Sequence, residues 1–290
     1  MFRSALRFAR PGALLLASLS LVACVGSAGA IAPSPSPDAV DGDTPVIRVS
    51  WAGGFVTPEM LLGRLPIVTV YADGRVITNG PVLAIYPGPL MPNLQERTLS
   101  AEGLQRLIDL AREKDLLKTV HYDFPGVADA ADTVLEIQLD GKTYRVSAYA
   151  LGDVATDTAA GLDQATIDGR ANLRAFVDML TAIPAGDFVD DEHPFAFDSV
   201  RIYAGKAVIV PNSELPGEQP AIDWPLADLA TAGDKVDNGV LDVRCQVVGD
   251  EDLSEVLPLL QDANSLATFR SEGQLYSFIV LPLLPGETGC

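Results

Sequence analysis

Histidine, cysteine and basic side chains are scarce in this chain, and each shortage excludes a class of protein. The 290 residues include only two histidines and three cysteines. So few cysteines exclude a disulfide-dense miniprotein, and His121 and His193, with no HExxH or CxxC motif, leave a zinc enzyme without its usual ligands. The 20 Lys and Arg residues are outnumbered by 39 Asp and Glu residues, for a net charge of −19. Because nucleic-acid binding depends on basic side chains, we expect no nucleic-acid partner.

Sequence signatures of common catalysts are also missing. The sequence contains no GxSxG or Ser-x-x-Lys motif for a nucleophilic serine, and no GxxxxGK[ST] or GxGxxG loop for phosphates. Its 48% hydrophobic residues are nevertheless ample for a packed core, so the chain is not wholly disordered. We therefore expect a folded protein that is not an enzyme and needs no cofactor.

The amino-terminal residues carry the one strong motif. Arg3, Arg7 and Arg10 precede an apolar run over residues 13–23, which is too short to span a bilayer but typical of a signal peptide. The run ends in LVAC (residues 21–24), which resembles the bacterial lipobox. The resemblance implies that residues 1–23 are a lipoprotein signal peptide and that Cys24 carries the lipid. The alternative is an ordinary signal peptide, cleaved after the Ala-Gly-Ala of residues 28–30.

The residues after Cys24 predict a tether followed by a folded domain. Residues 24–45 are rich in Pro, Ser, Gly and Ala and contain the repeat PSPSP, which favours extended chain. Residues 46–290 contain the periodic apolar segments but no further run of transmembrane length. We expect an extracytoplasmic protein, anchored to the cell membrane through the lipid on Cys24.

The remaining two cysteines predict a disulfide. An even pair in an exported protein favours pairing of Cys245 with Cys290, and the chain-entropy model assigns about 4 kcal/mol to such a loop. Two free thiols are the alternative.

Hydrophobic periodicity indicates an α+β fold in which antiparallel hairpins pack against about three amphipathic helices. Asp73-Gly74, Asp140-Gly141 and Glu272-Gly273 supply hairpin turns, and Ser100 is placed to cap the first helix. A loose repeat of strand or hairpin, then helix, then hairpin occurs in residues 67–149 and again in 241–284. Residues 46–185 and 199–290 therefore form either two similar subdomains or one domain with an acidic loop between them.

Acidic and aromatic residues supply the weak site candidates. Asp129 and Asp132 are candidates for a carboxylate-dependent hydrolase, although such acids more often cap turns. Asp190, Asp191 and Glu192 offer oxygen ligands for a hard cation but lack EF-hand spacing, and a solvated acidic loop is the alternative. Aromatic residues beside Pro/Gly loops, in YPGPLMPN and IDWPL, either line a groove for a peptide or sugar or fill the core.

A second resemblance adds only a compartment. The segments LPIVTVYADGRVITNG, YPGPLMPNLQERTLSAEGLQRLIDLA and DGKTYRVSAYALGD resemble exported proteins of high-GC bacteria that have no assigned activity. The resemblance implies no functional residues. From the sequence we predict a lipid-anchored cell-envelope protein with a non-enzymatic binding or scaffolding domain, bound to an envelope protein or small ligand. The alternative is a carboxylate-dependent hydrolase that acts on cell-wall material.

Overall fold

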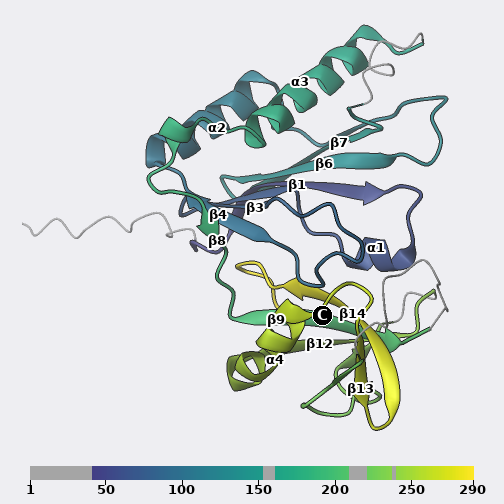
Figure 1. Ribbon diagram of the computed structural model, residues 1–290. Helices are drawn as coiled ribbons and strands as arrows, with labels where there is room; N and C mark the ends of the chain where they lie inside the picture. Colours follow the sequence, from purple (N-terminus) through teal and green to yellow (C-terminus); the bar gives the residue numbers. More distant parts are fainter. Residues whose placement is uncertain (1–40, 153–160, 209–220, 237–239) are drawn as a thin grey trace, which may run out of the picture. The chain divides into compact units, whose positions relative to one another are not determined.

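The computed structural model, shown in Figure 1, describes residues 41–152, 161–208, 221–236 and 240–290. Residues from 41 onward belong to one compact unit. The predicted signal peptide, Cys24 and most of the predicted tether lie outside the described residues. The described chain forms two β-sheets and four α-helices, which confirms the predicted α+β fold. Within the described parts, no helix is both long and apolar enough to cross a membrane.

The first sheet has eight strands in the order β5-β7-β6-β1-β2-β3-β4-β8. All neighbouring strands are antiparallel except β5 and β7, which are parallel. The strands are β1 (Pro45–Gly53), β2 (Val68–Tyr71), β3 (Arg75–Asn79), β4 (Leu94–Thr98), β5 (Val120–Tyr122), β6 (Ala131–Leu139), β7 (Lys142–Tyr149) and β8 (His193–Pro194).

The second sheet has six strands in the order β10-β13-β14-β9-β12-β11. Here β10 and β13 are parallel and the other neighbours are antiparallel. The strands are β9 (Ser199–Lys206), β10 (Ala221–Asp223), β11 (Asp234–Lys235), β12 (Val243–Gly249), β13 (Thr268–Ser271) and β14 (Gln274–Pro282).

The two sheets share a pattern but not a chain path. Each has a parallel edge strand, then a hairpin, then the first long strand of its half, β1 or β9. In the first sheet the leading strand of the hairpin, β6, pairs with β1, whereas in the second sheet the trailing strand, β14, pairs with β9. The halves therefore differ in topology, although both follow the strand, helix, hairpin order that the sequence indicated.

Local sequence explains the turns and helix ends. Asp140-Gly141 and Glu272-Gly273 all have positive φ, the geometry of the tight turns that match the twist of a hairpin. All three predicted hairpins are confirmed, since β2 and β3 also pair across Asp73-Gly74. Helix α2 (Ala101–Glu113) begins after Ser100, whose hydroxyl accepts a hydrogen bond from the Gly103 amide. Helix α3 (Gln164–Leu180) is capped in the same way by a carboxylate, that of Asp163.

Helices α2 and α3 cover one face of the first sheet (Figure 1), and α4 (Asp250–Asp262) packs on the second. A short helix, α1 (Pro58–Leu62), was not predicted; it has five residues, none of them buried.

Every residue of β2 is buried, because the opposite face of this strand is also covered. There Tyr71 and Ile77 of the first sheet meet Phe195 and Leu284 in a small third core cluster.

The carboxyl terminus is fixed by a disulfide between Cys245 in β12 and Cys290, with the Cα atoms 5.9 Å apart. This confirms the predicted pair. The amino end of the unit starts slightly earlier than Val46. Thr44 accepts a hydrogen bond from the Ala72 amide, and Asp43 pairs with Arg75 at 2.5 Å, although the sequence placed both residues in the tether.

Candidate functional site

The connection between β3 and β4, residues 80–93, is an uncharged loop rich in proline. Four prolines remove backbone donors, which explains why this apolar segment forms no strand. The base of the loop is closed by a hydrogen bond from the Gly80 amide to the Asn93 carbonyl, at 2.7 Å. Further along, the Leu90 amide donates to Ala263 just after α4, at 3.0 Å, and the Ser265 amide donates to Gly88, at 2.8 Å. These bonds fasten the loop to the second half of the unit.

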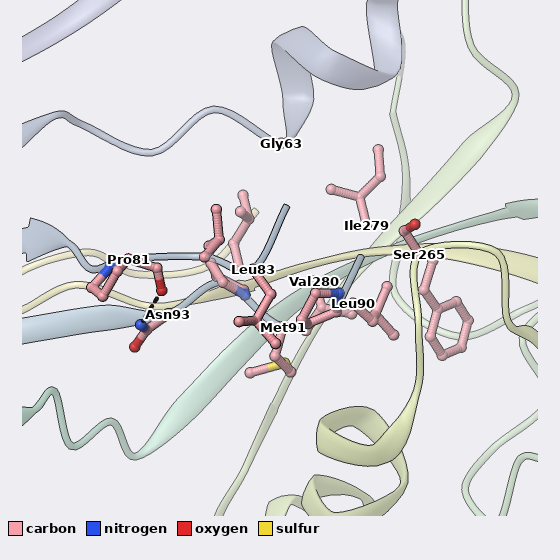
Figure 2. A pocket seen from close by; sticks show the side chains of 14 residues that line it. Gly63, Pro81, Leu83, Leu90, Met91, Asn93, Ser265, Ile279 and Val280 are labelled. Carbon is pink, nitrogen blue, oxygen red and sulfur yellow. Dashed lines mark hydrogen bonds between the residues drawn. The ribbon is translucent and has the colours of Figure 1, made fainter. Parts of the chain in front are cut away.

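An apolar cavity of about 600 Å³ lies between this loop, β14 and the end of α1, as Figure 2 shows. This volume lies within the range of about 300–1,000 Å³ that is usual for ligand sites. Leu83 of the loop and Ile279 of β14 face the turn at Gly63. The wall consists of Gly63, Pro81, Val82, Leu83, Pro89, Leu90, Met91, Pro92, Asn93, Ser265, Phe278, Ile279, Val280 and Leu281.

None of these wall residues is ionisable. The amide of Asn93 donates to the carbonyl of Pro81 at 2.7 Å, so it holds the loop together and is not directed at a ligand. Ser265 carries the one hydroxyl among the wall residues. The apolar cavity therefore suits an apolar guest, and its walls supply no general acid or base.

Large hydrophobic side chains are exposed on two segments, residues 82–86 of the cavity loop and residues 51–61, which end just before Gly63. We call them the apolar rim, and between 44% and 85% of each of these residues is exposed. The rim comprises Trp51, Phe55, Met60, Leu61, Val82, Leu83, Ile85 and Tyr86. Val82 and Leu83 belong also to the cavity wall, and Met60 and Leu61 come shortly before Gly63. Trp51 and Leu61 line a second, polar cavity. Among the rim residues, the sequence analysis singled out only Tyr86, as an aromatic residue beside a Pro/Gly loop; the exposure of the others depends on the fold.

A second cavity of about 430 Å³ is polar. It lies beside β1 and β6, and Arg48, Arg64, Glu136 and Glu287 contribute charges of both signs to it. These charges already have partners: Arg64 donates to the Gly53 carbonyl at 2.7 Å, and a guanidinium nitrogen of Arg48 lies 3.6 Å from a Glu287 carboxylate oxygen. Because the charges balance within the cavity, we assign no ligand to it.

Tyr71 lies close to this polar cavity and is fully buried. Burial is the main cause that raises the pKa of its phenol to about 12, with Arg48 opposing the rise and Glu287 adding to it. The hydroxyl therefore stays protonated at neutral pH and is unsuited to act as a base.

The hydrolase candidates Asp129 and Asp132 line neither the apolar nor the polar cavity. Asp129 occupies a turn with φ +65°, and its carbonyl accepts from the Phe55 amide at 2.9 Å. Asp132 begins β6 and lies 3.5 Å from Nδ1 of His121, the same nitrogen that lies 3.0 Å from the Ser147 hydroxyl. Both contacts use one ring nitrogen, so the three residues do not form the relay of a Ser-His-Asp triad.

The acidic candidates near β8 have separate roles. A carboxylate oxygen of Asp190 accepts a hydrogen bond from the Thr98 amide at 2.6 Å, which lowers the pKa of this acid. Asp191 and Glu192 are exposed. Across the described ranges, no three His, Cys, Asp or Glu side chains are grouped as a metal site would require.

The second tryptophan belongs to the core and not to a groove. Trp224 is buried and packs edge-on against Phe269 and Phe278, at ring distances of 5.9 and 5.1 Å. Of the two aromatic segments that the sequence offered, only YPGPLMPN therefore borders a cavity. No family model, curated protein or solved structure matches the chain. The proposal for its function accordingly depends on its own residues.

Proposed function

We propose that this chain is a lipid-anchored cell-envelope protein whose folded domain binds an apolar ligand in the apolar cavity. The observation that carries the proposal is an open cavity of about 600 Å³ whose wall is hydrophobic and whose mouth carries exposed hydrophobic side chains. An apolar guest that enters the cavity removes apolar surface from water, and the free energy of this transfer is favourable.

Binding is favoured over catalysis by the chemistry of the wall. General acid–base catalysis needs a titratable side chain within hydrogen-bond reach of the reacting atoms, and the wall residues offer none. The alternative, a carboxylate-dependent hydrolase, needs a second acid facing Asp132. In the described chain the ionisable side chain that contacts Asp132 is the imidazole of His121 and not a second carboxylate, so we place the binding function first.

The proposed anchor predicts a simple labelling result. In the bacterial host, full-length protein should incorporate labelled palmitate, and Cys24→Ala should abolish the label, because the thiol is the acceptor in the lipobox reading. Electrophoresis of the labelled cells followed by autoradiography measures the palmitate bound to the protein. Label that persists on Cys24→Ala would contradict anchoring at this residue, whereas the cavity proposal would be unaffected.

The cavity predicts a binding defect from a single bulky side chain. The chain from residue 25 onward keeps the whole compact unit and should increase the fluorescence of the apolar dye N-phenyl-1-naphthylamine. Ser265→Trp places an indole at the exposed edge of the cavity without removing a core atom, and should weaken dye binding at least about tenfold. Fluorescence titration gives the dissociation constants.

The matched control is Ser277→Trp. Ser277 is an exposed serine of β14 that does not line the apolar cavity, so the same substitution there should leave the dye affinity unchanged. Equal weakening by both variants, or no dye binding by the unmodified chain, would refute the proposed ligand site. Thermal unfolding of each variant establishes that the fold is kept.

A further inference from the structure

Exposed hydrophobic side chains are concentrated in one place. Eight of the thirteen large hydrophobic residues that are exposed in the described chain belong to the apolar rim. The eight come from two short segments, residues 51–61 and 82–86, within a unit of about 250 residues. Scattered single hydrophobic residues are normal on a protein surface, but such a concentration marks a surface that meets an apolar partner.

Charged residues are almost absent from the two segments. Residues 50–58 and 79–94 contain no Asp, Glu, Lys or Arg, in a chain of which 20% is charged. Charged side chains flank the rim: Glu59 lies on α1. Four more, Arg48, Arg64, Glu136 and Glu287, line the polar cavity beside Trp51 and Leu61, and Arg64 is bonded to the Gly53 carbonyl. Moving a charged side chain from water into hydrocarbon costs several kcal/mol of free energy. A segment that inserts at a bilayer surface must therefore be largely uncharged.

The tertiary structure brings the two segments to one site. Gly63, which follows Met60 and Leu61, stands across the mouth of the apolar cavity from Leu83 (Figure 2). Asn79, at the start of the uncharged loop, donates to the Pro66 carbonyl at 2.9 Å and ties the loop to the segment after α1. Leu61 also shares the polar cavity with Trp51, so both segments contribute to one surface that passes from the loop across the end of α1 to β1.

We propose that the apolar rim docks the domain on a lipid bilayer, with the acyl and glycerol region of the outer monolayer as its partner. Trp51 and Tyr86 are the side chains that prefer the membrane–water interface, and the aliphatic members and Phe55 enter the hydrocarbon boundary. Without residues 1–23 the chain has 17 basic and 39 acidic residues. An acidic body is repelled by anionic lipid, so the apolar rim and not electrostatic attraction supplies the affinity.

The chain ahead of the unit has the length that docking needs. Residues 24–40, between the predicted lipid and the first described residue, span at most about 60 Å when extended. The rim begins near the far end of β1 from the tether, and the nine residues of this strand cover about 30 Å. A lipid on Cys24 would thus leave the rim within reach of the same membrane and raise its effective concentration there.

Vesicle sedimentation tests this surface with a matched pair of substitutions. The chain from residue 25, which lacks any lipid, should sediment with phosphatidylcholine vesicles, and less with phosphatidylglycerol vesicles at low salt. Val82→Asp in the rim should lower the partition coefficient at least about tenfold. Val189→Asp is the control: Val189 is 67% exposed against 72% for Val82, it lies outside the rim, and it receives the same charge.

Phe55→Asp tests the other segment and should have an effect as large as that of Val82→Asp, because both side chains belong to one surface. The proposal is overturned if the unmodified chain stays in the supernatant, if Val189→Asp weakens sedimentation equally, or if sedimentation requires cationic lipid. It is also overturned if ultracentrifugation shows that the rim joins two copies of the chain and Val82→Asp only separates them. Failure of membrane docking can be distinguished from failure of ligand binding. Ser265→Trp tests the ligand cavity and should leave vesicle sedimentation unchanged, because Ser265 is not a rim residue.

Discussion

Arg170→Met is expected to lower the free energy of unfolding by about 3–5 kcal/mol. Arg170 is 1% exposed on α3, and its guanidinium donates to the carbonyls of Tyr149 at 2.8 Å and Ala150 at 3.2 Å. It also lies 4.9 Å over the ring of Phe124. Methionine keeps the apolar stem but donates no hydrogen bond. The half-buried Tyr149 at the end of β7 and the buried Ala150 after it would each lose a donor to the carbonyl, at a cost of about 1–3 kcal/mol for a buried carbonyl.

Urea unfolding of the chain from residue 25 measures the change. Arg174→Met is the matched control, because Arg174 lies one helical turn further along α3, has 34% of its side chain exposed, and pairs with Asp178 at 3.8 Å. An exposed pair of this kind contributes at most about 1 kcal/mol. Similar losses from the two variants would show that the contacts of Arg170 do not stabilise the junction of α3 with β7.

Gly169→Ala is expected to destabilise the protein by about 1–3 kcal/mol, although alanine is the better helix former by about 1 kcal/mol. A Cβ atom at Gly169 would lie 2.2 Å from the hydroxyl of Tyr122, and from the ring carbon that bears it. Tyr122 is 7% exposed in β5, so its ring has little room to move. The close packing of α3 on β5 therefore requires glycine at this position.

Thermal unfolding gives the sign of the effect. Gly186→Ala is the control, because a Cβ atom there meets nothing within 4 Å and the residue has no positive φ. In a Tyr122→Leu background, Gly169→Ala should cost less, since the shorter side chain removes the clash. A stabilising Gly169→Ala in the unmodified background would contradict the packing of α3 described here.

Local signals determined much of the fold from the sequence. Ser100 predicted the start of α2, and Asp140-Gly141 and Glu272-Gly273 predicted two hairpins, because these residues act on their own backbone neighbours. The pair Cys245 and Cys290 was found by counting, since only two cysteines remain once Cys24 is assigned to lipid. These predictions need no knowledge of distant contacts.

Short elements depended on tertiary structure. Strands β5, β8, β10 and β11 have two or three residues each, which is too few for a period to appear in the sequence. They form because a longer neighbouring strand offers free backbone groups, as β7 does for β5. Helix α1 likewise has five residues and no buried face, so its sequence has no amphipathic pattern that would predict a helix.

The candidate site shows the same division. The sequence shows that residues 80–93 are apolar, uncharged and interrupted by prolines, and it indicated a loop at the proline-rich residues 87–93. Hydrophobicity alone does not say whether such a segment is buried. Only the tertiary structure decided that Leu90 and Met91 pack on the second core while Val82, Leu83, Ile85 and Tyr86 stay exposed beside a cavity. The reason is that burial depends on what the rest of the chain places opposite each side chain, and α1, α4 and β14 are distant in sequence from this loop.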